Sequence, residues 1–231
     1  MIRTWAWVGI GAQVMFTVAW LVAQAWQPPT YRPLAHTISD RYAVGAPYPA
    51  VLMTAITLSG AGTIAFAVGA LRPALAGHWT GIVGWLLVAV SILGLGDLLT
   101  VFEREGCQLA VAGCTPKAQT ANAGGALDAA LSSFGLVALG ISGFFIGTAL
   151  RKRPALARFA WPARIGGVLV LVLLFAMGAF GAIGLSGLGE RIIAVAACAG
   201  GAGLALIVRR AASAEGEGAQ PSSSSPPKPI G

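Results

Sequence analysis

Charged side chains are scarce in this sequence. Only 10% of its 231 residues are Asp, Glu, Lys or Arg, whereas soluble domains carry about 25%. Hydrophobic residues make up 56% of the chain. This composition excludes a disordered chain, a disulfide-rich miniprotein and a typical cytosolic enzyme. It predicts a polytopic helical membrane protein.

Histidine is also scarce, and this limits the chemistry that the chain can support. The only two histidines, His36 and His78, are expected on opposite sides of the membrane, whereas a catalytic zinc site needs three ligands. The sequence contains no nucleophile elbow, P-loop, dinucleotide fingerprint or haem-attachment motif. We therefore predict no metal and no cofactor, and the sequence favours a protein that is not an enzyme.

Six apolar stretches are long enough to cross a bilayer, which takes about 20 residues. Their length and lack of alternation predict helices rather than strands, so the expected fold is an all-α bundle of six transmembrane helices spanning residues 1–210. The tail 211–231 is rich in Ser, Pro and Gly and is expected to be disordered and cytoplasmic. The predicted spans are 5–26, 51–71, 80–101, 126–150, 165–186 and 191–208.

Basic residues predict the orientation. The segment 151–164 carries five Lys or Arg and no acid, so it is expected in the cytoplasm. Six spans then place both termini in the cytoplasm, with ten basic residues inside and five outside. We expect a multi-pass protein of the inner (plasma) membrane. The net charge of +7 is interpreted as a topology signal, and no nucleic-acid partner is expected.

Small residues recur within the spans. Gly143 and Gly147 lie four residues apart in the fourth span, and a glycine occupies every third position from Gly178 to Gly187. Such spacing is typical of close helix packing in membranes. A groove of small residues that admits a lipid chain or another ligand is the alternative.

Two long loops are expected on the outer face, 27–50 and 102–125. Cys107 and Cys114 share the second loop, where an oxidising compartment would favour a disulfide; free thiols and a metal site are the alternatives. Ionisable groups inside membrane spans are rare and often functional. We therefore expect an outer-face polar cluster, whose candidate members are His36, Ser39, Asp40, Asp97, Asp128, Glu190 and Arg191. Capping and helix-dipole roles are alternatives for the acids.

Two motifs carry a family resemblance. The first runs from Tyr31 through His36, Thr37, Ile38 and Ser39 to Asp40, and the second is the run Gly187–Ile192, which includes Glu190 and Arg191. Over roughly residues 5–210 the chain resembles the prokaryotic membrane family catalogued as domain of unknown function 998. The resemblance implies a six-span bundle and no established activity. The family pattern has a histidine near the start of the fourth span, where this chain has Leu127 and Asp128.

The resemblance also suggests a clasp, in which the first outer loop folds back and pairs with Glu190 and Arg191. We expect a structural, lipid-associated or accessory protein whose outer loops meet membrane lipids or other membrane protein subunits. One alternative is an enzyme acting on lipid-linked substrates, which predicts an outer cavity lined by Asp97, Asp128 and His36. A small-solute transporter is the other, and it requires a polar path through the bundle.

Overall fold

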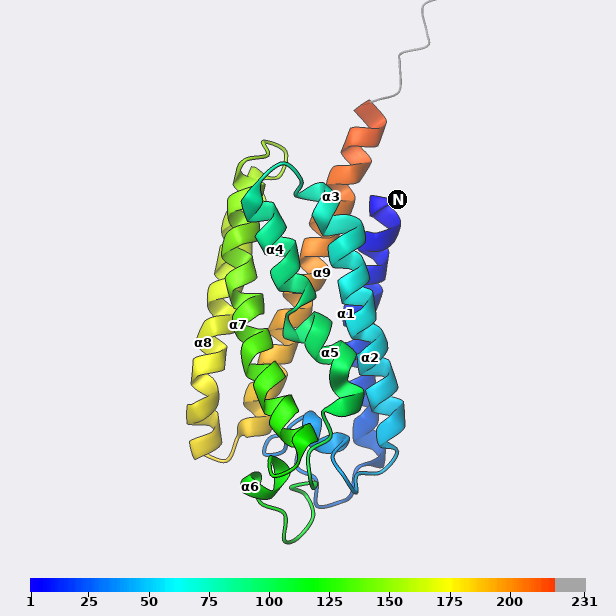
Figure 1. Ribbon diagram of the computed structural model, residues 1–231, viewed down its shortest axis with the longest axis vertical. Helices are drawn as coiled ribbons and strands as arrows, with labels where there is room; N and C mark the ends of the chain where they lie inside the picture. The colour runs from blue at the N-terminus through cyan, green and yellow to red at the C-terminus, as the bar shows by residue number, and fades with distance from the viewer. Residues whose placement is uncertain (219–231) are drawn as a thin grey trace, which may run out of the picture.

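A computed structural model describes residues 1–218, and within them the chain is helical and contains no strand (Figure 1). Six helices are long and apolar enough to cross a membrane, which confirms the all-α six-span fold. The spans cover Ile2–Trp26, Pro49–Ala74, Trp79–Phe102, Ala123–Arg151, Ala157–Ala182 and Ser186–Ser213. Their principal helices are α1 (Ile2–Val22), α2 (Pro49–Phe66), α4 (Trp79–Ala89), α7 (Ala123–Arg151), α8 (Ala160–Ala182) and α9 (Ser186–Gly218).

The last two spans differ most from their predicted bounds. The fifth ends at Ala182 rather than at residue 186, because the chain turns at Gly184, whose φ of +74° suits glycine. Helix α9 continues to Gly218 and so passes the predicted boundary at residue 210. The rest of the predicted tail, 219–231, lies outside the described residues.

The helices pack side by side as an elongated bundle (Figure 1). Helix α1 packs between α2 and α9, while α7 packs between α4 and α8, and α8 also contacts α9. A Cβ added at Gly143 would lie 2.5 Å from the carbonyl oxygen of Ala163, and one at Gly147 would lie 2.6 Å from that of Ala160. These two glycines therefore let α7 approach α8 closely, as their spacing predicts. Gly178 has nothing within 4 Å of such a Cβ, so it does not contribute to this packing.

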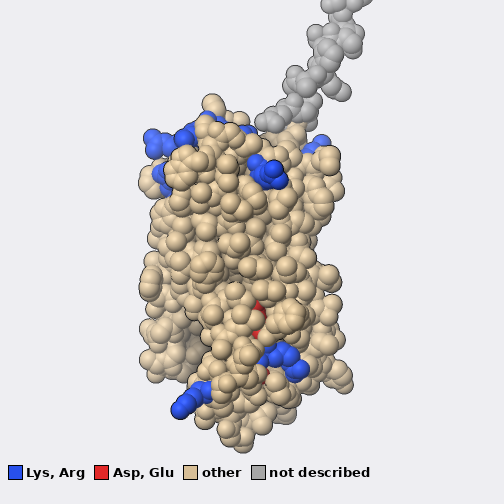
Figure 2. Space-filling view, viewed as in Figure 1, with Lys and Arg blue, Asp and Glu red and all other residues tan. Residues whose placement is uncertain are grey.

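The two ends of the bundle differ. At the loop end lie the segments 27–48, 103–122 and 183–185, and at the basic end lie the first residues of α1 and the turns 75–78 and 152–156. Figure 2 shows Lys and Arg confined to the two ends with an uncharged belt between them, as expected for a protein that spans a membrane. Acidic atoms are almost absent from this face (Figure 2), because the acids of the loop end are buried.

The third span is not a continuous helix. Helix α4 ends at Ala89, Ser91 has an extended backbone, and a π-turn at Ile92–Gly96 leads into the short helix α5 (Asp97–Leu99). This break is packed between α2 and α7: a Cβ at Gly60 would lie 2.7 Å from the Gly94 carbonyl oxygen. Irregular backbone inside a membrane is tolerated where protein covers it or where it lines a cavity.

Candidate functional site

The loop 27–48 folds back over the bundle and is anchored by its own aromatic and basic side chains. Arg41 is only 2% exposed, and it donates to the backbone carbonyl of Trp20 and to Oε1 of Gln24. Its Nε also donates to the hydroxyl oxygen of Tyr31 over 2.8 Å. Cation–π contact with the Tyr31 ring, 5.0 Å from the guanidinium carbon, adds to this anchor. Arg41 therefore serves the loop rather than a carboxylate.

The N-terminal part of α9 holds the same loop. Glu190 accepts a hydrogen bond from the backbone N–H of Ile38, and Arg191 donates to the carbonyl oxygens of Pro33 and His36. Gly187 permits this approach, since a Cβ there would collide with both carbonyls. The contacts expected between this loop and the Glu190–Arg191 pair are present.

The second loop closes over the first and contains a disulfide between Cys107 and Cys114. Asp40, fully buried, accepts hydrogen bonds from the backbone N–H of Leu109 and from Nε2 of Gln119. The same Gln119 amide donates to Oε2 of Glu105 over 2.7 Å. The short helix α6 (Pro116–Gln119) thus connects the two loops through one side chain.

Beneath these loops lies a cavity of about 330 Å³ whose lining is rich in carboxyl groups. Five of the eight acidic residues in the chain line it, and they come from the third span, the second loop, α7 and α9. Among the described residues no Lys or Arg lines the cavity. Its acidic residues are Asp97, Glu103, Glu105, Asp128 and Glu190.

Two of these acids have a buried oxygen without a hydrogen-bond partner. Asp97, placed at the wall by the break in the third span, is 5% exposed, and its Oδ2 has no partner among the described residues. Glu103 is 2% exposed, and the same is true of its Oε1. The other acids are held by the protein: Ser39 donates to Glu105 over 3.0 Å and Tyr42 donates to Asp128 over 3.3 Å. Buried polar atoms nearly always have partners, so the two free oxygens indicate a place for a ligand or for water.

Burial changes the acidity of the loop carboxyls. It raises the pKa of Glu103 to about 8, and the neighbouring carboxylate of Asp128 acts in the same direction. Burial also raises the pKa of Glu105 to about 8, although the hydrogen bond from Ser39 opposes this. Each charged form is disfavoured chiefly by loss of water and secondly by the nearby Asp128 carboxylate. A cation placed there would reverse that effect.

The predicted candidates divide into two groups. Ser39, Asp97, Asp128 and Glu190 line the cavity, whereas His36, Asp40 and Arg191 do not. The His36 ring packs against Tyr31, with centroids 5.3 Å apart, and its Nδ1 accepts a hydrogen bond from the N–H of Arg32. The expected cavity lined by Asp97, Asp128 and His36 together is therefore wrong with respect to His36, because the loop turns that ring away.

Sequence reasoning missed Glu103, Glu105 and Tyr42 as members of the site. The Glu-Arg-Glu run directly after the third span is the available signal, but its position after a span end indicates only a loop. Among the described residues, no group of three His, Cys, Asp or Glu side chains is arranged to hold a metal ion. The five acids thus surround a volume rather than converging on one point.

Comparison with known families agrees with the architecture. A family described as a protein of unknown function (DUF998) matches residues 10–207. The chain belongs to this family. The DUF998 match covers the second to fifth spans in full, most of the first and sixth, the loop 27–48 and both motifs that carry the resemblance. Searches of curated proteins and of solved structures find no match.

Proposed function

We propose that this protein is a lipid-associated, non-enzymatic membrane protein that binds a positively charged headgroup in the carboxyl-lined cavity. The observation that carries the proposal is the lining itself: five acids, no basic residue among the described lining, and the unpartnered oxygens of Asp97 and Glu103. A primary ammonium group supplies both the positive charge and the N–H donors that these oxygens lack.

Charge complementarity selects against other ligands. A phosphate, sulfate or carboxylate headgroup would add negative charge to five acids in a medium of low dielectric constant. A neutral hydroxyl group would offer a donor but would not offset the repulsion between the acids. A bare metal ion is not supported, because no three His, Cys, Asp or Glu side chains in the described part of the chain are arranged to hold one.

The loop end is proposed to face the outside of the cell, with both termini in the cytoplasm of the inner membrane. Among the described residues, nine Lys or Arg lie toward the basic end and five toward the loop end, and this excess supports the orientation. The disulfide in the second loop supports it as well, since disulfides persist in oxidising compartments. In this orientation the cavity opens toward the outer leaflet.

The test is equilibrium binding of three small probes to the full-length protein in nanodiscs: hexylammonium, hexanol and hexanoate. We expect hexylammonium alone to bind and to raise the melting temperature. Asp97→Asn and Glu103→Gln, which keep shape and remove charge, should each weaken binding about tenfold, as for a hydrogen bond to a charged group.

The matched control is Asp40→Asn, a buried acid outside the cavity lining. It should leave hexylammonium binding unchanged. Equal binding of all three probes, or equal affinity in wild type and in both cavity variants, would overturn the proposal.

A further inference from the structure

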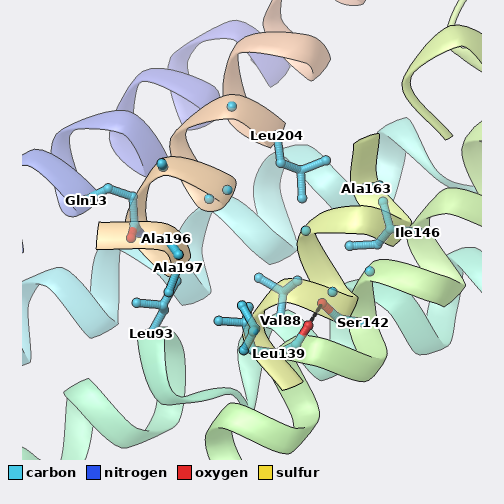
Figure 3. A pocket seen from close by; sticks show the side chains of 18 of the residues that line it. Gln13, Val88, Leu93, Leu139, Ser142, Ile146, Ala163, Ala196, Ala197 and Leu204 are labelled. Carbon is cyan, nitrogen blue, oxygen red and sulfur yellow. Dashed lines mark hydrogen bonds between the residues drawn. The ribbon is translucent and has the colours of Figure 1, made fainter. Parts of the chain in front are cut away.

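A second cavity, of about 230 Å³, lies in the middle of the bundle, next to the acidic one. It is surrounded by α7, α8 and α9, with contributions from α1, α2 and α4. Figure 3 shows the apolar side chains of Val88, Leu139, Ile146 and Leu204 around it. Leu93 and Ala197 line both cavities. The carboxyl-rich cavity and the apolar cavity are therefore adjacent, and they share these two residues in their walls.

The apolar cavity opens toward the bilayer between α8 and α9. Of its lining residues, Pro162 on α8 and Ala199 and Gly200 on α9 are exposed. Within the described residues, α8 is the least buried of the six spans, and its main packing partners among the long helices are α7 and α9. Hydrocarbon chains are the medium at this depth, so they have direct lateral access to the opening.

Small residues create the width of this cavity. A Cβ at Gly200, Gly203 or Gly166 would meet nothing within 4 Å. These glycines therefore differ from Gly143, which permits contact between helices, because they face open volume. Glycines of α8 and α9 thus border open volume, whereas Gly143 of α7 packs against α8.

We propose that the apolar cavity holds the hydrocarbon chain of the same ligand whose ammonium headgroup occupies the acidic cavity, so that the ligand is a lipid-like amphiphile. This inference rests on the proposed function. The headgroup lies at the loop end and the chain runs toward the middle of the membrane. That is the orientation of a lipid in the leaflet that contains the loop end.

Polarity agrees with a hydrocarbon chain rather than a peptide or a polar solute. The lining has few polar side chains: Gln13 donates to Thr63 over 2.9 Å, and the Ser142 hydroxyl donates to the Leu139 carbonyl over 2.6 Å (Figure 3), whereas the amide oxygen of Gln13 has no partner among the described residues. Five acids line the acidic cavity, whereas no acid is among the described residues that line the apolar one.

The test is photocrosslinking with dodecylammonium that carries a diazirine in its chain, applied to the full-length protein in nanodiscs. We expect crosslinks on cavity peptides of α7 and α9, such as those with Ile146 and Leu204. Gly200→Leu fills the open volume and should reduce these crosslinks about tenfold, because overpacking excludes the chain.

The matched control is Gly178→Leu, also in a position with free space but outside the cavity lining. It should leave the crosslinks unchanged. A diazirine-bearing dodecanol of the same length should label the cavity weakly. Crosslinks spread evenly over the lipid-facing surface, or unaffected by Gly200→Leu, would overturn the chain site.

Failure of this inference is separable from failure of the proposed function. If hexylammonium binds and depends on Asp97 while Gly200→Leu leaves the crosslinks intact, the headgroup site stands and the chain site is wrong. If Asp97→Asn changes neither hexylammonium binding nor crosslinking by dodecylammonium, the headgroup site itself is wrong.

Discussion

Nη2 of Arg191 lies 2.8 Å from the hydroxyl oxygen of Tyr31, which joins the N-terminal part of α9 to a loop near the other end of the sequence. The same oxygen accepts from Arg41, so one phenol serves two arginines. Tyr31→Phe should therefore leave two guanidinium donors without their partner. We expect a loss of about 1–3 kcal/mol of folding free energy, measured as a lower melting temperature.

Tyr48→Phe is the control for this substitution, because Tyr48 is 70% exposed. Its melting temperature should match that of the wild type. If Tyr31→Phe is equally stable, the two arginines do not depend on this phenol.

Stability should fall as pH rises from about 5 to 9. In the folded protein the pKa values of Glu103 and Glu105 are about 8, above their ordinary value of 4.5. Between those values the folded state binds more protons than the unfolded state, so stability is fully present below the unfolded pKa and is lost as pH rises through the folded pKa. Melting temperatures measured between pH 5 and 9 give the dependence of stability on pH.

Glu105→Gln should flatten that dependence, because glutamine stays neutral at every pH. Its amide oxygen also continues to accept the hydrogen bond from Gln119. A melting temperature that is flat from pH 5 to 9 in the wild type would mean that these carboxyls titrate normally.

The disulfide should hold the second loop in place. Replacing Cys107 and Cys114 with serine removes a cross-link around a short loop, which is worth about 2–3 kcal/mol in the chain-entropy account. We expect faster hydrogen exchange in residues 103–119, and no such change in Cys198→Ser, whose thiol is free and lies in the bundle.

The same cysteines report the orientation. After mild reduction of intact cells, a membrane-impermeant maleimide should label Cys107 and Cys114 if the loop end faces outward. Labelling that requires permeabilised cells would reverse the proposed topology.

Packing between α7 and α8 should be sensitive to a single methyl group. Gly147→Ala places a Cβ 2.6 Å from the Ala160 carbonyl oxygen, so backbone must shift. We expect Gly147→Ala to lower the free energy of unfolding by about 1–3 kcal/mol. A Cβ at position 178 has free space around it, so Gly178→Ala should raise the free energy of unfolding by up to about 1 kcal/mol through the higher helix propensity of alanine. Unfolding in mixed micelles compares the two, and equal effects would contradict the close approach.

The spans could be predicted because hydrocarbon imposes length and polarity on any helix that crosses it. The clasp followed from the family motifs that contain His36 and Glu190. The break in the third span could not be predicted, because its sequence, Val90 through Gly96, is as apolar as a continuous helix. Gly60 on α2 and Gly135 on α7 make room for it, and both lie far away in the sequence.

The acidic site was only partly predictable, because its members come from segments that lie far apart in the sequence. Asp97 and Asp128 stood out because acids are rare in apolar spans. Glu103 and Glu105 follow a span end, where acids usually face water, and only the second loop folding over them buries both. His36 was placed wrongly because its neighbour Tyr31 holds the ring, a contact within one loop that spacing does not reveal.

Proton release on ligand binding tests the central claim most directly. Alkylammonium groups stay charged below about pH 10, and a cation in the cavity should lower the pKa of Glu103 and Glu105 from about 8. Calorimetry of hexylammonium binding at pH 7 in buffers of different ionisation enthalpy should therefore show protons released, with affinity rising between pH 6 and 8.5. Binding without proton release, and with an affinity independent of pH, would contradict a headgroup site built from these carboxyls.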